Sequence, residues 1–216
     1  MAAFAAPHAL SNSTPMNVRK VASRSDPRVL RSRRALGDAL VELLHERRFD
    51  DITVQDILDR ASVGRATFYA HYRNKQDVLH SGLEHLFTHL DGVLERGSAA
   101  GTRLVPVREF LEHMQEADVF VASLRASGRL DEMWELSLDF VADMVRRRIQ
   151  PRDGVPATMP PTLVARMLAA AFMEMVRWWL ERPARETPER LDATFHALAG
   201  AILLRSQYVV PLTRKG

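Results

Sequence analysis

The chain has 216 residues, of which 46% are hydrophobic and 26% are charged, and its formal net charge is +3. This is the composition of an ordinary globular protein with room for one domain or two small ones, so it excludes collagen-like, coiled-coil-only and mostly disordered chains. Because the chain has no cysteine, disulfide frameworks, thiolate metal sites and cysteine nucleophiles are excluded as well. A reducing compartment is compatible with this, and we expect a cytoplasmic protein.

The positive charge is concentrated near the N-terminus. Between Arg19 and Arg34 there are seven basic residues and one acid, a charge of +6. Residues 11–26 are rich in Ser, Asn, Thr, Pro and Arg, and the first ten residues lack the basic start of a secretory signal. We therefore expect residues 1–26 to form a flexible basic arm that follows a polyanion. A solvated arm without a partner explains the same charge equally well.

Three helices are predicted between residues 27 and 75, the first ending near Arg47 and the other two short. Asp26 can cap the first helix and Pro27 can occupy its first turn, and the leucines at 36, 40, 43 and 44 form one apolar stripe. Thr53 begins a second helix, with Asp56 three residues later as an imperfect capping box. After a turn of small residues, a third helix runs from Arg65 to about residue 71. Two short helices joined by three or four residues are typical of a helix-turn-helix.

The third helix has a buried face and an outward face. Phe68 and Tyr72 are four residues apart and are expected to face the core together with Val63. Arg65 lies at the N-terminal end of the helix, where a guanidinium can reach the paired acceptors of guanine. Thr67 carries a hydroxyl that can bind a phosphate of the DNA backbone. The outward face of this helix therefore predicts contacts with DNA.

The ordered string of residues resembles a known family. Thr53-Val-Gln-Asp-Ile-Leu, Ala61-Ser-Val-Gly-Arg-Ala-Thr-Phe-Tyr-Ala-His-Tyr-Arg-Asn-Lys and Asp77-Val-Leu are similar to the DNA-binding domain of TetR/AcrR family transcriptional regulators, over about residues 28 to 90. The resemblance implies a homodimer on a palindromic operator of double-stranded DNA, with an all-α C-terminal domain. The family commonly has Phe where Tyr72 stands, so the Tyr72 hydroxyl either reaches solvent or needs a partner. The candidate DNA-binding residues are Arg28, Arg31, Thr53, Gly64, Arg65, Ala66, Thr67, Tyr69, His71, Tyr72 and Lys75.

Everything after the third helix is predicted to be helical. A long helix opens near Asn74, and later helices are expected over residues 106–114, 118–126, 129–149, 161–182 and 188–206. The apolar run 163–180 contains Arg166, Glu174 and Arg177, which are costly in a bilayer, so we expect a buried helix and no membrane contact. The fold is therefore predicted to be all-α with about nine helices: residues 27–75 form the DNA-binding domain and residues 76–216 a ligand-binding and dimerisation domain.

The last two helices combine small and large apolar residues. Alanines and a glycine at 169–171, 197 and 199–201 lie beside large residues such as Trp178 and Phe195. Two such helices suit a four-helix bundle between two protomers, and we expect a homodimer through residues 161–206. An intramolecular core is the alternative.

A ligand pocket is also expected in this half. Most of the nine methionines lie between Met114 and Met175, and methionine suits a pliable apolar pocket, although the same residues are equally typical of a core. The candidate residues for a small hydrophobic inducer are Phe87, Met114, Trp134, Leu138, Met167, Phe172 and Met175. Arg125, Arg146 or Arg177 could pair a ligand carboxylate, but solvated helix faces also explain them.

The chain shows no pattern of an enzyme and no complete metal site. It lacks a nucleophile elbow, a His-Glu-x-x-His helix and a Gly-rich phosphate loop, so we expect neither catalysis nor a cofactor. His85 and His89 share a helix face, but the spacing supplies no third ligand. The predicted function is a repressor that a ligand releases from its operator. The alternatives are a transcriptional activator and a helical adaptor without an inducer.

Overall fold

The computed structural model describes residues 27–96, 103–182 and 186–211. Within these ranges the chain forms nine α-helices, one short 3-10 helix and two strands of two residues each. The prediction of an all-α fold with about nine helices is confirmed. The predicted basic arm, residues 1–26, and the predicted cap at Asp26 lie outside the described residues.

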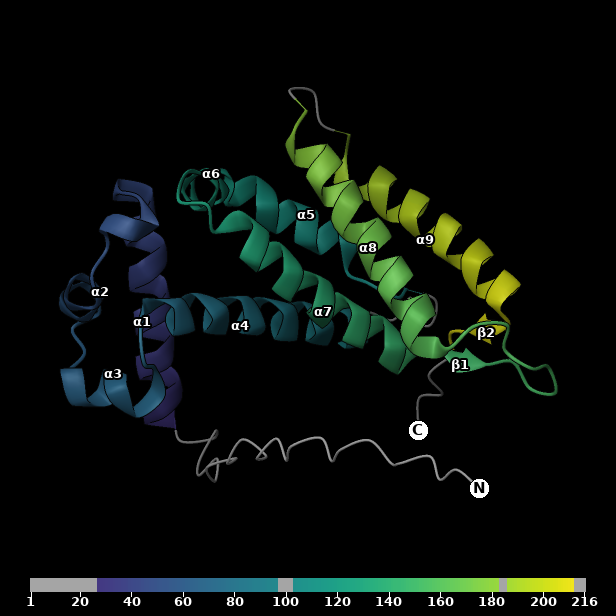
Figure 1. The fold of residues 1–216 in the computed structure, drawn as a ribbon, viewed down its shortest axis with the longest axis horizontal. Helices are drawn as coiled ribbons and strands as arrows, with labels where there is room; N and C mark the ends of the chain where they lie inside the picture. Colours follow the sequence, from purple (N-terminus) through teal and green to yellow (C-terminus); the bar gives the residue numbers. More distant parts are fainter. Residues whose placement is uncertain (1–26, 97–102, 183–185, 212–216) are drawn as a thin grey trace, which may run out of the picture.

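The first three helices form an N-terminal three-helix unit (Figure 1). It consists of α1 (Pro27–Glu46), the 3-10 turn η1 (Phe49–Asp51), α2 (Val54–Ala61) and α3 (Arg65–His71). The predicted leucine stripe of α1 is buried against Phe49, Ile57 and Phe68, each fully shielded from solvent. The capping box of Thr53 and Asp56 is present in both directions, as the spacing predicts. The sequence pattern and the observed helices therefore agree in this part of the chain.

Helix α4 (Lys75–Arg96) leads from the three-helix unit into the C-terminal helices (Figure 1). These are α5 (Val107–Glu116), α6 (Asp118–Ala126), α7 (Leu130–Arg148), α8 (Pro161–Leu180) and α9 (Pro188–Ser206). The predicted bounds of α6 and α9 agree with the structure, while α8 ends two residues before the predicted Arg182. Aromatic rings form much of the core of this part: Phe110 stacks on Phe87 with 5.6 Å between centroids and meets Phe172 edge to face.

A small sheet closes the C-terminal end of the described chain. Strand β1 (Gln150–Pro151) pairs antiparallel with β2 (Tyr208–Val209). The sequence shows no clear alternation there, because strands of two residues are too short to display a period. The Tyr208 side chain is buried, and its hydroxyl donates to the Met159 carbonyl oxygen at 2.8 Å. This contact fastens the segment before α8 to the end of α9.

The three-helix unit is joined to the C-terminal helices by packing as well as by α4. Leu124 of α6 and Met133 of α7 are buried in the same hydrophobic cluster as the leucines of α1. Arg48 donates to the Ala126 carbonyl oxygen at 2.7 Å, and the Phe49 amide donates to the Ser127 hydroxyl at 3.1 Å. The loop between α6 and α7 therefore contacts the turn between α1 and α2. The three-helix unit and the C-terminal helices are thus in direct contact at this point.

None of the helices in the described ranges combines the length and the hydropathy that crossing a membrane would require.

Candidate nucleic-acid interface and ligand cavity

The turn between α2 and α3 is tight and well hydrogen-bonded. Ser62 adopts the left-handed conformation, with φ of 53°, and its amide donates to the carbonyl oxygens of Asp59 and Leu58. The Val63 amide also donates to Leu58 O, at 3.1 Å, and the Val63 side chain packs partly buried against the core of the three-helix unit. This turn sets α3 at an angle to α2, which is the arrangement of a helix-turn-helix.

Helix α3 has the two faces that the spacing predicts. Phe68 is fully buried and Tyr72 is 5% exposed, whereas Tyr69 is 54% exposed. Gly64, Arg65 and Ala66 are exposed, and Thr67 and His71 are half-buried. The N-terminal end of α3 therefore presents a guanidinium, a methyl group and a phenol to solvent, which suits insertion into a major groove.

Arg65 is held in place by a residue that the sequence analysis did not single out. Its Nη2 atom donates to Gln55 Oε1 at 2.6 Å, and Gln55 Nε2 donates to Asp59 Oδ1 at 2.7 Å. Gln55 lies on the exposed side of α2, and its polar side chain on that face was the available signal. The series of hydrogen bonds from Arg65 to Gln55 and from Gln55 to Asp59 therefore orients the Arg65 guanidinium in the absence of DNA.

Thr53 is engaged locally. Its hydroxyl donates to Asp56 Oδ2 at 2.7 Å and accepts from the Asp56 amide at 3.1 Å. Hydrogen bonds from Thr53 keep the pKa of the Asp56 carboxyl below its usual value. A phosphate at this helix start must therefore compete with an ionised carboxylate for the Thr53 hydroxyl.

Lys75 makes internal contacts. Its ammonium donates to the carbonyl oxygens of Phe49, Asp50 and Ile52 at 2.6, 3.1 and 2.7 Å. An ammonium has three donors, so all of them are used within the protein. Burial lowers the pKa of Lys75 from its ordinary value. Lys75, one of the candidate DNA-binding residues, thus ties the start of α4 to the turn after α1 in this structure.

Tyr72, one of the candidate DNA-binding residues, is turned away from the exposed face of α3. Its hydroxyl donates to Ser81 Oγ at 3.1 Å and accepts from Arg33 Nε at 3.3 Å. The hydroxyl therefore has partners and does not reach solvent. The expectation that Tyr72 faces DNA does not agree with this structure, because its spacing of four residues from Phe68 places the ring in the core. Of the remaining candidates, Arg28 and Arg31 lie exposed on the first turns of α1.

A cavity of about 780 Å³ lies between α1, α4, α5, α6 and α7, and we call it the junction cavity. Of the seven residues expected to bind a ligand, Met114 and Trp134 line it. The structure does not bring the other five to it. Phe87 and Phe172 are buried in the core, Leu138 and Met175 pack half-buried against that core, and Met167 is 44% exposed on α8. Helical periodicity identifies apolar faces but does not separate a cavity wall from a packed core.

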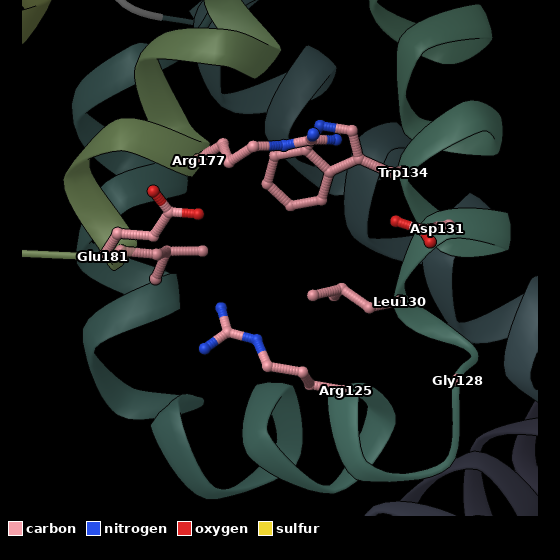
Figure 2. A pocket seen from close by; sticks show the side chains of 8 residues that line it. Arg125, Gly128, Leu130, Asp131, Trp134, Arg177 and Glu181 are labelled. Atoms are coloured by element: carbon pink, nitrogen blue, oxygen red, sulfur yellow. The ribbon is translucent and has the colours of Figure 1, made fainter.

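A smaller hollow of about 240 Å³ lies between α6, α7 and α8 (Figure 2). Arg125 and Arg177 point into this α6–α8 hollow, and the Arg177 guanidinium lies 5.3 Å from the centroid of the Trp134 ring. Asp131 and Glu181 line the same hollow. The two cations are thus matched by two carboxylates, which leaves no net charge to attract an anion.

Among the described residues, the histidines on α4 have no partners with which to form a metal centre. His85 and His89 are exposed at the edge of the junction cavity. Across the described parts of the chain, no cluster of three or more His, Cys, Asp or Glu side chains is placed to hold a metal ion.

The fold and the exposed face of α3 define the class of protein: an all-α protein with an N-terminal helix-turn-helix. Comparisons with known proteins agree with this class. Residues 36–81 match the family model described as bacterial regulatory proteins, tetR family. The uncharacterized HTH-type transcriptional regulator YxbF of Bacillus subtilis (strain 168) is 40% identical over 60 residues, which cover 27% of this chain and 16% of YxbF.

Solved structures extend the likeness to the C-terminal helices. A TetR transcriptional regulator from Streptococcus agalactiae 2603V is 25% identical, with a TM-score of 0.50 over 80% of this chain and 95% of that one. The dihydroxyacetone kinase operon activator DhaS is 20% identical, with a TM-score of 0.56 over 82% of this chain and 98% of that one. Residues 36–81 are therefore similar to the tetR family of bacterial regulatory proteins, and 80 to 82% of the chain shares its fold with these two solved structures.

Proposed function

We propose that the chain acts as a homodimeric repressor of a palindromic operator and that a small apolar ligand releases it from DNA. The observation that carries the DNA-reading part is the exposed end of α3, where Arg65, Ala66 and Tyr69 lie over the buried Phe68. Arg65 supplies base contacts in this proposal, whereas Tyr69 and the cations of α1 supply phosphate contacts.

An exposed apolar face on α8 and α9 supports the homodimer through residues 161–206. Leu163, Met167 and Trp178 of α8 are 38 to 47% exposed, and Leu198 and Leu204 of α9 are 64% and 58% exposed. The alanines at 170, 171, 197 and 201 are exposed as well, although Ala169 and Ala199 are buried. Small residues let helices approach closely, and several large apolar side chains exposed on two neighbouring helices are typical of a protein interface. An operator with two half-sites also requires two copies of α3.

The junction cavity supports the ligand response. It touches α1 of the three-helix unit and α5 to α7 of the C-terminal helices, so a ligand there contacts both of the proposed domains, residues 27–75 and 76–216. A volume of about 780 Å³ is within the range of small-molecule sites. A ligand that binds one arrangement of the two domains more tightly shifts the population toward it, and operator affinity changes accordingly.

Activation is the second candidate. DhaS is by name an operon activator, and its structure is similar to this chain in fold. A reporter gene behind the bound operator separates the two: deleting the regulator raises expression if it represses and lowers expression if it activates. Because the proposed target is DNA, we expect the protein to act in the cytoplasm.

A mobility-shift experiment with the DNA that flanks the chain's own gene tests the proposal. The expected result is one retarded species at low salt whose stoichiometry is two chains per operator. The Ala variant of Arg65 is the matched control, because it should retain weak binding to all sequences and lose its preference for the operator. Absence of any shift at low salt, or a shift by a single chain, contradicts the proposal.

A further inference from the structure

Arg33 is a half-buried cation whose hydrogen-bond partners among the described residues are all neutral. Its Nε donates to the Tyr72 hydroxyl at 3.3 Å, and its Nη2 donates to Ser81 Oγ at 2.9 Å. Within the described residues no carboxylate lies at ion-pair distance from it. A guanidinium has five N–H donors, so three of them remain for another acceptor.

Arg33 faces the junction cavity together with both of its partners. Most of the remaining wall is apolar and includes Phe110, Met114 and Trp134. The acidic residues of the wall, Asp38 and Glu116, are exposed. The cavity therefore combines an apolar interior with a cation, Arg33, whose charge is balanced by no carboxylate among the described residues.

The neighbouring arginine differs in each of these respects. Arg34 also lines the cavity, but its side chain is 85% exposed and lies 3.8 Å from Asp38. In the α6–α8 hollow, Arg125 and Arg177 share the space with Asp131 and Glu181. A partly desolvated cation without a counter-charge is unfavourable, and an anion placed against it relieves that cost. Of these four arginines, Arg33 is thus the one at which a bound anion is stabilised most.

We propose that the junction cavity binds an apolar anion, with its anionic head group on Arg33, Tyr72 and Ser81 and its apolar part against Phe110, Met114 and Trp134. The planar guanidinium suits two oxygens of a carboxylate or sulfonate, and the two hydroxyls can donate to the same head group. This inference rests on the proposed ligand response and names the chemical class of the ligand.

The position of the head-group site also explains how ligand binding affects α3. Arg33 belongs to α1, Tyr72 follows α3 directly, and Ser81 belongs to α4. The free N–H groups of Arg33 can take the head group without losing a bond, but the Tyr72 hydroxyl must give up its hydrogen bond to Ser81 Oγ in order to donate to the same head group. The bonds that orient the end of α3 relative to α1 and α4 therefore change when the ligand binds, so the ligand acts on the DNA-binding unit directly.

Equilibrium titration without DNA tests the proposal, with dodecanoate as the anionic probe and dodecanol as its neutral counterpart. Calorimetry or Trp fluorescence reports binding to the full chain. The wild-type protein is expected to bind dodecanoate roughly tenfold to a hundredfold more tightly than dodecanol, because charge-assisted hydrogen bonds are worth that much. Equal affinities for the two probes, or no binding of dodecanoate, would overturn the proposal.

Arginine variants locate the head group. Arg33→Met should bind dodecanol like the wild type and lose the preference for dodecanoate. Arg33→Lys, which keeps the charge but not the planar fork, should keep a reduced preference and guards against misfolding of the first variant. Arg34→Met and Arg177→Met are the matched controls and should keep the full preference. Loss of the preference in Arg177→Met but not in Arg33→Met would also overturn the proposal.

A parallel mobility shift separates this inference from the proposed function. Operator binding by the wild type without any preference for dodecanoate refutes the anion site and leaves DNA recognition intact. Arg33-dependent dodecanoate binding that leaves operator affinity unchanged supports the site and refutes the ligand-released repressor.

Discussion

The Nζ atom of Lys75 lies 2.6 Å from the carbonyl oxygen of Phe49 and 4.6 Å from the centroid of the Phe49 ring. The first residue of α4 thus closes the turn that follows α1 and leads to α2. Because Lys75 also bonds Asp50 and Ile52, one side chain fixes the start of α4 relative to the whole three-helix unit. We therefore expect Lys75 to affect DNA binding only indirectly, by fixing how the three-helix unit is arranged.

This role predicts that Lys75→Met destabilises the protein. The variant loses the charged hydrogen bonds to the turn, and we expect the free energy of unfolding to fall by roughly 2 to 3 kcal/mol in urea titrations. The control is Arg73→Met, because Arg73 is 87% exposed and its ion pair with Asp77 contributes little.

The salt dependence of DNA binding distinguishes an internal tie from a phosphate contact. An internal tie leaves the slope of log K against log salt unchanged in Lys75→Met. A slope smaller by about one would instead show that Lys75 neutralises a phosphate in the complex and would refute its role as a tie.

Arg65→Ala is predicted to change which DNA sequence is preferred. The variant should lose about 1 to 3 kcal/mol of discrimination at one base position, because a guanidinium that reads guanine is removed. Tyr69→Phe removes only a hydroxyl at an exposed position and should weaken binding to all sequences alike. Fluorescence anisotropy with the operator and its single-base variants measures both effects, and unchanged discrimination in the Arg65 variant would count against α3 as the reading element.

Leu198→Glu is predicted to disrupt the homodimer. Leu198 is 64% exposed in the single chain, so a charge there leaves the protomer folded but disfavours an apolar interface. Val119→Glu is the matched control, because Val119 is 54% exposed and belongs to α6, outside the proposed interface of residues 161–206. Sedimentation velocity should show monomers for the first variant and dimers for the second. A wild-type monomer at micromolar concentration would refute the interface.

Acid is predicted to destabilise the protein through Glu109. Arg103 lies 2.7 Å from Glu109 and 2.7 Å from Asp192 of α9, and the hydrogen bond from Arg103 lowers the pKa of Glu109 from 4.5 to about 2. Because the pKa of Glu109 is lower in the folded state than in the unfolded state, its ionised carboxylate stabilises the folded protein above pH 4.5. This stabilisation is lost as the pH falls toward 2. The contribution is on the order of 3 kcal/mol.

Glu109→Gln tests this contribution. The variant should unfold at lower temperature than the wild type at pH 7, and the difference should shrink between pH 4.5 and pH 2. A difference that stays constant across this window would show that the carboxylate charge is not responsible.

The elements that sequence reasoning predicts well depend on neighbours in the chain. Thr53 and Asp56 are three residues apart, and Phe68 and Tyr72 share one face of a short helix, so caps and periodicity suffice for them. The contacts of Lys75 with Phe49 span 26 residues, and those of Arg33 with Ser81 span 48. No local pattern encodes such partners, because they depend on how the helices pack. For the same reason, the apolar faces of α4 to α8 were visible in the sequence but the position of the cavity between them was not.

Footprinting on the DNA that flanks the chain's own gene tests the central claim most directly. We expect the wild-type dimer to protect one palindromic site with two half-sites about one helical turn apart, or a multiple of it, and Arg65→Ala to abolish this selective protection. No protected site at low salt, or the same selective protection by the Arg65 variant, would contradict it.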